Sequence, residues 1–511
     1  MKKTFIKYLF VASAAFLVSC EVDFEDPITD EGFYTTGEAN MSSFVAVGNS
    51  LTAGFADGAL YITGQENSYP NILAQQFALA GGGEFTQPLV NDNLGGLLLS
   101  GNQIAANRFV LSVDANGNPG PAVLAGTPTT DVANGLASPF NNMGVPGAKS
   151  YHLIAPGYGD VNGVLTGTAN PYFARMATSS SATVIGDATS LNPSFFSLWI
   201  GNNDILSYAT SGGSGVDQTG NPDPSTYGPN DITDPTAFAG IVSQEVEALA
   251  AGTSGGVLLN IPDVTSIPFF TTVPVNSIPL DEATAAQLNA TFAQYNDVIL
   301  PTLVAFSVIS AEEAASRVIS FTPGLGNAPI IRDVDLTDVS AILQGPPANL
   351  PPELADLLGQ LRQANENDLL TLTAAGVLGA QIGDDPTAIG GVSVPLENQF
   401  VLTANEQARV AAAGAAYNAA LQGIAAANDL AFVDARSALA QVANGGVTSN
   451  GITITDQFVT GGAFSLDGVH PTPRGYAYTA NLIIQAINAK YGATIPLVDI
   501  GTFGTVTAAN N

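Results

Sequence analysis

The 511-residue chain has few charged side chains, and very few of them are basic. Only 11% of the residues are charged, with 13 Lys and Arg against 44 Asp and Glu, which gives a formal net charge of −31. Nucleic-acid phosphates are bound by clustered Lys and Arg, so this balance argues against a nucleic-acid partner. It argues equally against attachment to anionic lipid by charge alone. The simplest explanation of the acidity is the solubility of an exported protein.

Cysteine is nearly absent, since Cys20 is the only one and no disulfide can form within the chain. A lysine-containing start is followed by a mostly apolar stretch over 8–18, which is too short for a stable membrane span. The residues before Cys20 are small or aliphatic and resemble the lipobox of bacterial lipoproteins, in which the cysteine is lipidated after cleavage. We therefore expect a signal peptide over 1–19 and a membrane anchor on lipidated Cys20. A buried core thiol is the alternative.

Long apolar runs are also lacking after the start, so the lipid anchor is the only membrane element that the sequence predicts. Residues 20–43 are acidic and have no clear periodicity, which favours a tether between anchor and domain. The folded domain is expected over 44–495, and residues 496–511 are expected to form a C-terminal tail.

Apolar runs typical of buried strands alternate along the chain with segments that predict helices. The runs are continuously apolar rather than alternating in polarity, which indicates a parallel sheet covered on both faces. Strands are expected near 44–47, 195–200, 256–261 and 430–433. Helices are expected near 69–80, 235–250, 282–300, 404–427 and 475–491, several of them behind N-capping residues.

Two other regions have a distinct character. Residues 108–113 and 121–124 flank a turn-forming segment and predict a hairpin. Residues 306–400 carry few strand signals and a helix over 352–364, so they are expected to form a large, mostly helical insertion.

Ser50 is the hydroxyl that follows the strand predicted over 44–47, after a break at Gly48. In α/β hydrolases a nucleophilic serine stands on such a sharp strand-to-helix turn, where the helix N-terminus favours developing negative charge. A serine at this place can also simply cap the helix. Ser50 therefore predicts chemistry only if the chain supplies partners for it.

A serine nucleophile needs a base, a group that orients the base, and donors for the oxyanion. The chain has two histidines, His152 and His470. His470 lies three residues after Asp467, a spacing that lets the carboxylate hold Nδ1 while Nε2 takes the serine proton. The alternative is a capping aspartate beside a surface histidine. His152 is close to a Gly/Pro-rich turn, and we expect a structural role for it.

Two further positions could donate hydrogen bonds to an oxyanion. Asn203 follows a buried strand and a glycine, at the sheet edge where ligands of open α/β folds bind. Gly147 ends a Gly/Pro/Asn-rich turn of the kind that leaves a backbone N–H facing outward. Taken singly, each could equally be an ordinary turn residue.

Together these pieces, in their chain order, resemble the four sequence blocks of the SGNH, or GDSL-type, hydrolases. The blocks are Gly-Asn-Ser-Leu at 48–51, Gly147, Gly-Asn-Asn-Asp at 201–204 and Asp-Gly-Val-His-Pro at 467–471. The resemblance places the Ser, Gly, Asn and His that name the family on Ser50, Gly147, Asn203 and His470. It makes Asp467 the acid of the catalytic triad.

The resemblance implies a flavodoxin-like three-layer α/β/α sandwich and the hydrolysis of an ester through an acyl-enzyme. Ser50 would attack the carbonyl, His470 would act as base and then as acid, and Asp467 would hold the imidazole. The backbone N–H groups of Ser50 and Gly147 and the Asn203 side chain would hold the oxyanion. No metal or organic cofactor is needed. With the lipobox, the resemblance points to the envelope of a Gram-negative bacterium, on either face of the outer membrane.

Two features depart from the family pattern. The usual aspartate before the serine is Asn49, which removes a charge but no member of the triad. The insertion over 306–400 separates Asn203 from His470 and could be a lid, a substrate platform or a structural elaboration.

The leading expectation is therefore an esterase or lipase-type acylhydrolase whose partners are an ester substrate and the membrane. A carbohydrate esterase acting on an acylated glycan, usually by removing acetyl groups, is the alternative among hydrolases. A transacylase would have the same residues. A surface lipoprotein that only binds is a further alternative, and the presence of all four blocks argues against it.

Overall fold

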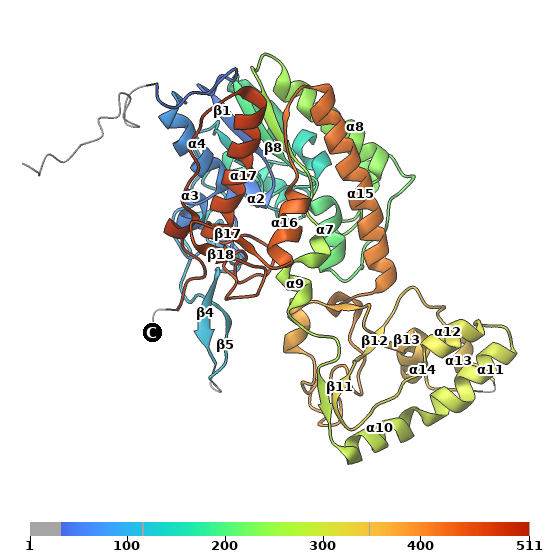
Figure 1. Cartoon of the computed structure of the whole chain (residues 1–511). Helices are drawn as coiled ribbons and strands as arrows, with labels where there is room; N and C mark the ends of the chain where they lie inside the picture. Colours follow the sequence, from blue (N-terminus) through green and yellow to red (C-terminus); the bar gives the residue numbers. More distant parts are fainter. Residues whose placement is uncertain (1–31, 115–116, 347, 510–511) are drawn as a thin grey trace, which may run out of the picture.

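The computed structural model describes residues 32–114, 117–346 and 348–509. The predicted signal peptide, Cys20 and the first part of the acidic tether lie outside the described residues. Figure 1 shows two lobes: an α/β lobe formed by both ends of the described chain and a second lobe formed by its middle. We define the second lobe as residues 272–400.

A five-stranded sheet forms the centre of the α/β lobe. Its order is β16-β9-β8-β1-β7, and all four strand pairs are parallel. The strands are β1 (Phe44–Gly48), β7 (Asn142–Gly144), β8 (Phe195–Trp199), β9 (Gly256–Leu259) and β16 (Ala431–Val433). The predicted α/β fold with a central parallel sheet is confirmed. β7 lies in the Gly/Pro/Asn-rich segment that ends at Gly147, which was expected to be only a turn.

Helices pack against the sheet in two groups, because its strands are apolar on both faces. On one side α4 (Tyr69–Leu79) packs against α17 (Pro473–Tyr491), and the rings of Phe77 and Tyr491 both contact Phe195. The other group consists of α6 (Val184–Ser190), α8 (Pro235–Ala250) and α15 (Ala404–Ala427). Figure 1 shows α17 and α15 on different sides of the sheet.

The capping residues begin these helices where the sequence predicts. Ser68 accepts from the N–H of Asn71, and Asp234 accepts from the N–H of Ala237. Thr403 and Glu406 form the reciprocal capping box of α15. The predicted hairpin is also present and pairs β4 (Phe109–Val113) with β5 (Pro119–Val123).

Shorter elements surround the sheet edges and connect the main helices. The helices are α2 (Ser50–Ala53), α3 (Ile62–Glu66), α5 (Pro171–Met176), α7 (Asn203–Thr210), α9 (Pro268–Thr271) and α16 (Ala435–Ala443). The strands are β2 (Leu97–Leu99), β3 (Asn102–Ala105), β6 (Thr130–Asp131), β17 (Val447–Ser449) and β18 (Ile452–Ile454).

The C-terminal segment packs on the α/β lobe up to the end of the described residues. Ile500 is fully buried, and the backbone of Leu111 in β4 exchanges hydrogen bonds with Thr507 and Ala509. Within the described ranges, none of the helices is both long enough and apolar enough to cross a membrane.

The second lobe has a hydrophobic core of its own, which extends from Ile278 to Val392. Its helices are α10 (Glu282–Gln294), α11 (Leu300–Ala305), α12 (Ala311–Ser316), α13 (Ser340–Gln344) and α14 (Pro352–Gly359). Its strands are β10 (Ile278–Leu280), β11 (Gly324–Asn327), β12 (Ile330–Arg332), β13 (Leu361–Gln363) and β14 (Leu369–Leu370), the last of which pairs with β15 (Val401–Leu402).

Two expectations for this region need correction. The lobe begins before residue 306, because α10 buries Leu288 and Phe292 in the second core rather than against the sheet. It is also less helical than expected. The helix predicted over 352–364 ends at Gly359, and β13 then pairs with β12 in an antiparallel hairpin.

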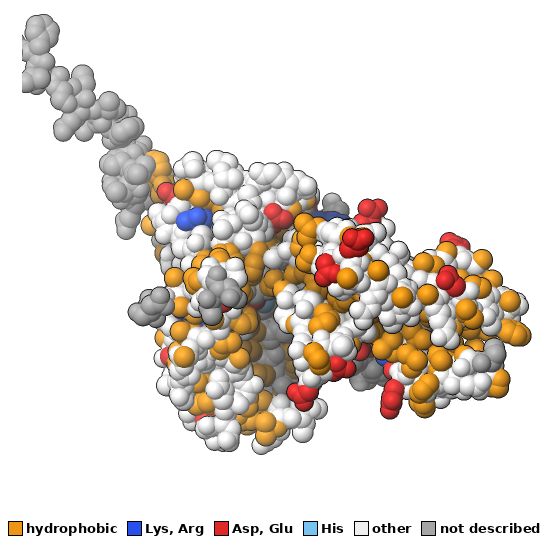
Figure 2. Space-filling model, turned by 90° about the horizontal axis from the view of Figure 1, so that it is seen from below, with side chains coloured by type: hydrophobic (Ala, Val, Ile, Leu, Met, Phe, Trp, Pro, Cys, Tyr) orange, Lys and Arg blue, Asp and Glu red, His pale blue; other side chains and the backbone are white. Residues whose placement is uncertain are grey.

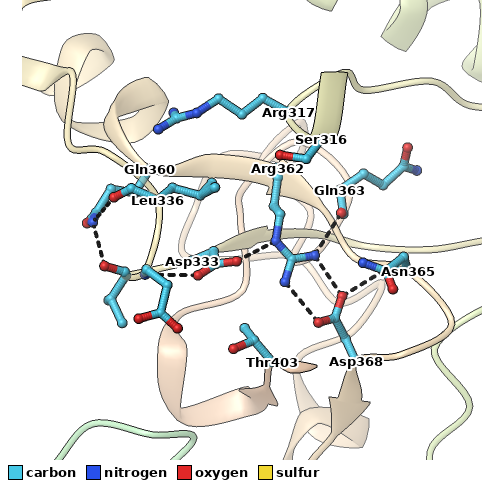
Figure 3. A network of polar contacts seen from close by, with 12 residues as sticks. Ser316, Arg317, Asp333, Leu336, Gln360, Arg362, Gln363, Asn365, Asp368 and Thr403 are labelled. Carbon is cyan, nitrogen blue, oxygen red and sulfur yellow. Dashed lines mark hydrogen bonds and ion pairs between the residues drawn. The ribbon is translucent and has the colours of Figure 1, made fainter. Parts of the chain in front are cut away.

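A buried arginine ties this hairpin to the chain that returns to the α/β lobe. Arg362 on β13 donates to Asp333 at 2.5 Å and makes two bonds to Asp368, at 2.7 and 2.8 Å. Figure 3 shows the guanidinium between the two carboxylates. On the α/β lobe, Arg409 of α15 donates to Tyr208 of α7 and pairs with Asp335 of the second lobe. The Arg409 contacts place the second lobe beside α7 and α15.

Candidate active site

The turn after β1 sets the position of Ser50. Asn49 caps α2 by accepting the N–H of Leu51 at 3.0 Å, and Ser50 is the first helical residue. Gly48 is required here, because a Cβ would lie 2.3 Å from Thr52 Oγ1 and 2.4 Å from the Trp199 carbonyl oxygen. The strand-to-helix turn thus presents the Ser50 hydroxyl at the carboxyl end of the sheet, where ligands of open α/β folds bind.

The structure brings Ser50, His470 and Asp467 together in a chain of hydrogen bonds. Nε2 of His470 lies 2.9 Å from Oγ of Ser50, and Nδ1 lies 2.9 Å from Oδ2 of Asp467. Ser50 and His470 are 420 residues apart in sequence. The distances suit transfer of the serine proton to an imidazole that a carboxylate orients.

The Asp467 carboxylate is held in its ionised form by donors around it. Oδ1 accepts the backbone N–H groups of Val469 and His470, each at 2.8 Å, and the Ser465 hydroxyl at 3.1 Å. Burial works to raise the pKa of Asp467, but the charge and hydrogen bonds of His470 and the backbone donors outweigh it and lower the pKa to about 2. An ionised acid at this place stabilises a protonated His470.

A second loop, after α2, supports Asp467 from the N-terminal part of the chain. The Gly58 N–H donates to Oδ2 of Asp467 at 2.9 Å, and Asp57 accepts the N–H of Leu466 at 3.0 Å. Tyr61 donates to Asp57 at 2.8 Å. This loop is not predicted from the sequence, although Asp-Gly is a common turn dipeptide and follows Ser50 closely.

Three donors are available for an oxyanion. Asn203 is the first residue of α7 and is 8% exposed, and its Nδ2 donates to the Ala148 carbonyl at 2.9 Å. The second N–H of that amide remains for a substrate oxygen. Gly147 is exposed and has a φ of +82°, which glycine adopts without strain. Among the described residues, the backbone N–H groups of Ser50 and Gly147 donate to no protein acceptor.

Two buried contacts hold the three loops together. Asp204 accepts the N–H and the hydroxyl of Ser150, at 2.9 and 2.7 Å, which ties the Gly147 loop to the Asn203 loop. Asn49 donates from Nδ2 to Oδ1 of Asn202 at 3.1 Å. Asn49 is fully buried, so the residue that departs from the family pattern links the Ser50 turn to the Asn203 turn.

His152 takes no part in this chain of contacts. Its Nδ1 accepts the backbone N–H of Lys149 at 3.1 Å, and its ring stacks on Tyr158 with centroids 4.4 Å apart. Burial first, and then the charge of Lys149, lowers the pKa of His152 to about 4. These contacts fit the structural role expected for it.

A pocket opens beside the Ser50 hydroxyl, with a cavity volume of about 120 Å³. Ser50, Asn203 and His470 line it on the polar side, and most of the other lining side chains are apolar. Figure 2 shows that basic side chains are sparse on the face it draws, in line with the composition of the chain.

Within the described part of the chain, no three His, Cys, Asp or Glu side chains are grouped to hold a metal ion. Searches with this chain found no matching family model, no matching curated protein and no matching solved structure.

Proposed function

We propose that the protein is a serine carboxylic ester hydrolase that works through an acyl-enzyme. The observation that carries the proposal is the continuous hydrogen-bond chain from Ser50 through His470 to Asp467. The order of groups suits transfer of the Ser50 proton to Nε2 of His470, because the ionised Asp467 carboxylate contacts Nδ1 on the other side of the imidazole.

In the first half of the reaction, Ser50 Oγ attacks the carbonyl carbon and passes its proton to Nε2 of His470. The bond to the leaving oxygen breaks, and the alcohol departs with that proton. In the second half, water attacks the acyl-enzyme, His470 takes a proton from the water and returns one to Ser50, and the carboxylic acid is released.

The oxyanion of each tetrahedral intermediate would be held by the N–H groups of Ser50 and Gly147 and by the Asn203 side chain. Such donors act at fixed positions, so they stabilise the transition state without reorganisation during the reaction. The hydrogen bonds through Asp204 and Asn49 hold the loops that carry these donors.

The order of the blocks around these residues supports membership of the SGNH hydrolases. Counted along the chain, the sheet order is 2-1-3-4-5, which is the order of flavodoxin-like folds. The lipobox supports a lipid anchor on Cys20 and a place on the bacterial envelope, with the outer membrane as the proposed site.

The test uses the purified full chain, a series of p-nitrophenyl esters and a fluorophosphonate probe that labels activated serines. Wild type should hydrolyse esters and take up the probe, and Ser50→Ala should do neither. A wild-type chain that is folded yet inert toward both the esters and the probe would refute the hydrolase and favour the binding lipoprotein.

A further inference from the structure

The pocket beside Ser50 changes character along its length. At the nucleophile its wall is polar and contains Asn49, Asn202 and Asn203 besides Ser50 and His470. Farther in, the wall is mostly aliphatic and aromatic, and among the residues that the structure describes no Asp, Glu, Lys or Arg lines the pocket. A site of this kind matches a ligand with one polar group at the reacting end and an apolar remainder.

The apolar part lies between two helices near the ends of β9 and β16. α16 contributes Ala435 and Ala438, whose short side chains leave the space open, and α17 contributes Tyr478 and Leu482. Val264 and Ile267, in the segment that leads to the second lobe, add another part of the wall. The space is therefore built from elements of the α/β lobe.

This wall offers little to a sugar. Hydroxyl groups that leave water need hydrogen-bond partners, and leaving one unpaired weakens binding. An acetyl group would fill only the mouth, whereas an alkyl chain would cover the aliphatic wall. Each buried methylene is worth about 0.8 kcal/mol, which corresponds to about fourfold in kcat/KM.

We infer that this pocket is the acyl-binding site and that it takes a straight alkyl chain of medium or greater length. The inference rests on the proposed hydrolase function and names its substrate class, which is esters of fatty acids. The ester carbonyl lies at Ser50 and the chain runs inward between α16 and α17. Hydrolysis then releases a fatty acid and an alcohol by the balanced steps given above.

Chain-length profiles test the geometry. Ala438→Phe should fill the space between the helices and lower the ratio of kcat/KM for decanoate to that for acetate by roughly tenfold or more. Ala440→Phe is the matched control, since it makes the same change on the exposed side of α16 and should keep the wild-type ratio. Leu482→Ala enlarges the pocket and should move the preference toward longer chains.

Direct binding gives a readout that does not need turnover. Trp199 is the only tryptophan, is 4% exposed and lines the pocket. 11-Bromoundecanoic acid should quench its fluorescence saturably, because a bound chain places the bromine in the apolar wall, whereas 3-bromopropionic acid at equal concentration should not. Ser50→Ala should still be quenched, Ala438→Phe should lose the effect, and Ala440→Phe should keep it.

The two measurements separate the failure of the pocket from the failure of the enzyme. Ester hydrolysis with an acetate preference, unaffected by Ala438→Phe and without quenching, would overturn the acyl pocket and leave the hydrolase. Quenching by the long acid without turnover of any ester would overturn the hydrolase and retain a fatty-acid site. The inference is supported if kcat/KM rises with acyl length in the wild type and this rise is lost in Ala438→Phe.

Discussion

Two loops of this protein each hold a histidine by its Nδ1 atom, and the partner of that atom differs in kind. In the loop at 465–471, Nδ1 of His470 meets the Asp467 carboxylate and Nε2 meets the Ser50 hydroxyl. In the loop at 147–154, Nδ1 of His152 accepts a backbone N–H, and the charge of Lys149 helps to lower its pKa. The first environment places a carboxylate against the ring, and the second opposes a protonated ring.

A histidine becomes a base through the groups that surround it. An imidazole that accepts a proton in a transition state needs a negative group to stabilise the new charge. His470 has that group. His152 has burial and Lys149, which both work against protonation and lower its pKa. The same substitution at each histidine tests this distinction, and substitutions around His470 test which groups it depends on.

The largest effect is expected from replacing each histidine by glutamine in turn. His470→Gln should lower kcat for ester hydrolysis by roughly 10⁵–10⁶, because it removes both base and acid. His152→Gln should leave kcat close to the wild-type value at pH 7. Both are measured as p-nitrophenyl ester turnover, and an equal loss in the two variants would contradict the distinction between the loops.

Asp467→Asn should have the next largest effect. The amide keeps the shape of the side chain but removes the charge that stabilises a protonated His470, so kcat should fall by about 10⁴. Far-UV circular dichroism identifies a folded variant. Near wild-type turnover in a folded Asp467→Asn protein would show that His470 does not depend on this carboxylate.

Asn203→Ala should cost roughly 10² to 10³ in kcat, with a smaller effect on KM, since the lost donor acts mainly in the transition state. The exposed Asn162 provides a matched control, and Asn162→Ala should behave as wild type. Wild-type kcat in Asn203→Ala would remove Asn203 from the oxyanion site.

Much of this arrangement could be predicted from the sequence, because it depends on local signals. The apolar strands, the helix caps at Ser68, Asp234 and Thr403, and the Asp-x-x-His spacing are each contained in a few neighbouring residues. The structure places Ser50, Asp467 and His470 together as the motifs suggested.

What could not be predicted depends on contacts between distant segments. Periodicity shows that α10 has an apolar face, but it does not show which core that face joins, and the limits of the second lobe were therefore misplaced. The Asp57–Gly58 loop and the bond from Asn49 to Asn202 join positions that carry no mutual signal in one sequence. β7 is three residues long, and the residues around it are typical of turns. The sequence pattern therefore did not indicate a strand there.

The smallest expected effect is on the pH dependence of stability, and His152 provides it. The folded-state pKa of His152 is about 4, below its ordinary value of 6.5, so between these values the unfolded chain binds more protons than the folded one. The contribution of His152 to the free energy of unfolding therefore falls as pH falls from 6.5 toward 4, by on the order of 2 kcal/mol. Glutamine does not titrate, so His152→Gln removes the contribution.

Urea unfolding of wild type and His152→Gln, followed by the fluorescence of Trp199, measures the effect in the α/β lobe. The wild type should lose stability relative to the variant between pH 6.5 and pH 4.5, and the two curves should run parallel above pH 7.5. Burial raises the pKa of Glu406 to about 7, so this carboxyl adds stability as pH falls, opposite to His152. Its contribution is the same in wild type and His152→Gln and cancels when their free energies of unfolding are compared. Parallel curves down to pH 4.5 would mean that His152 accepts a proton in the folded state as readily as in the unfolded chain. The electrostatic contrast between the two histidine loops would then be lost.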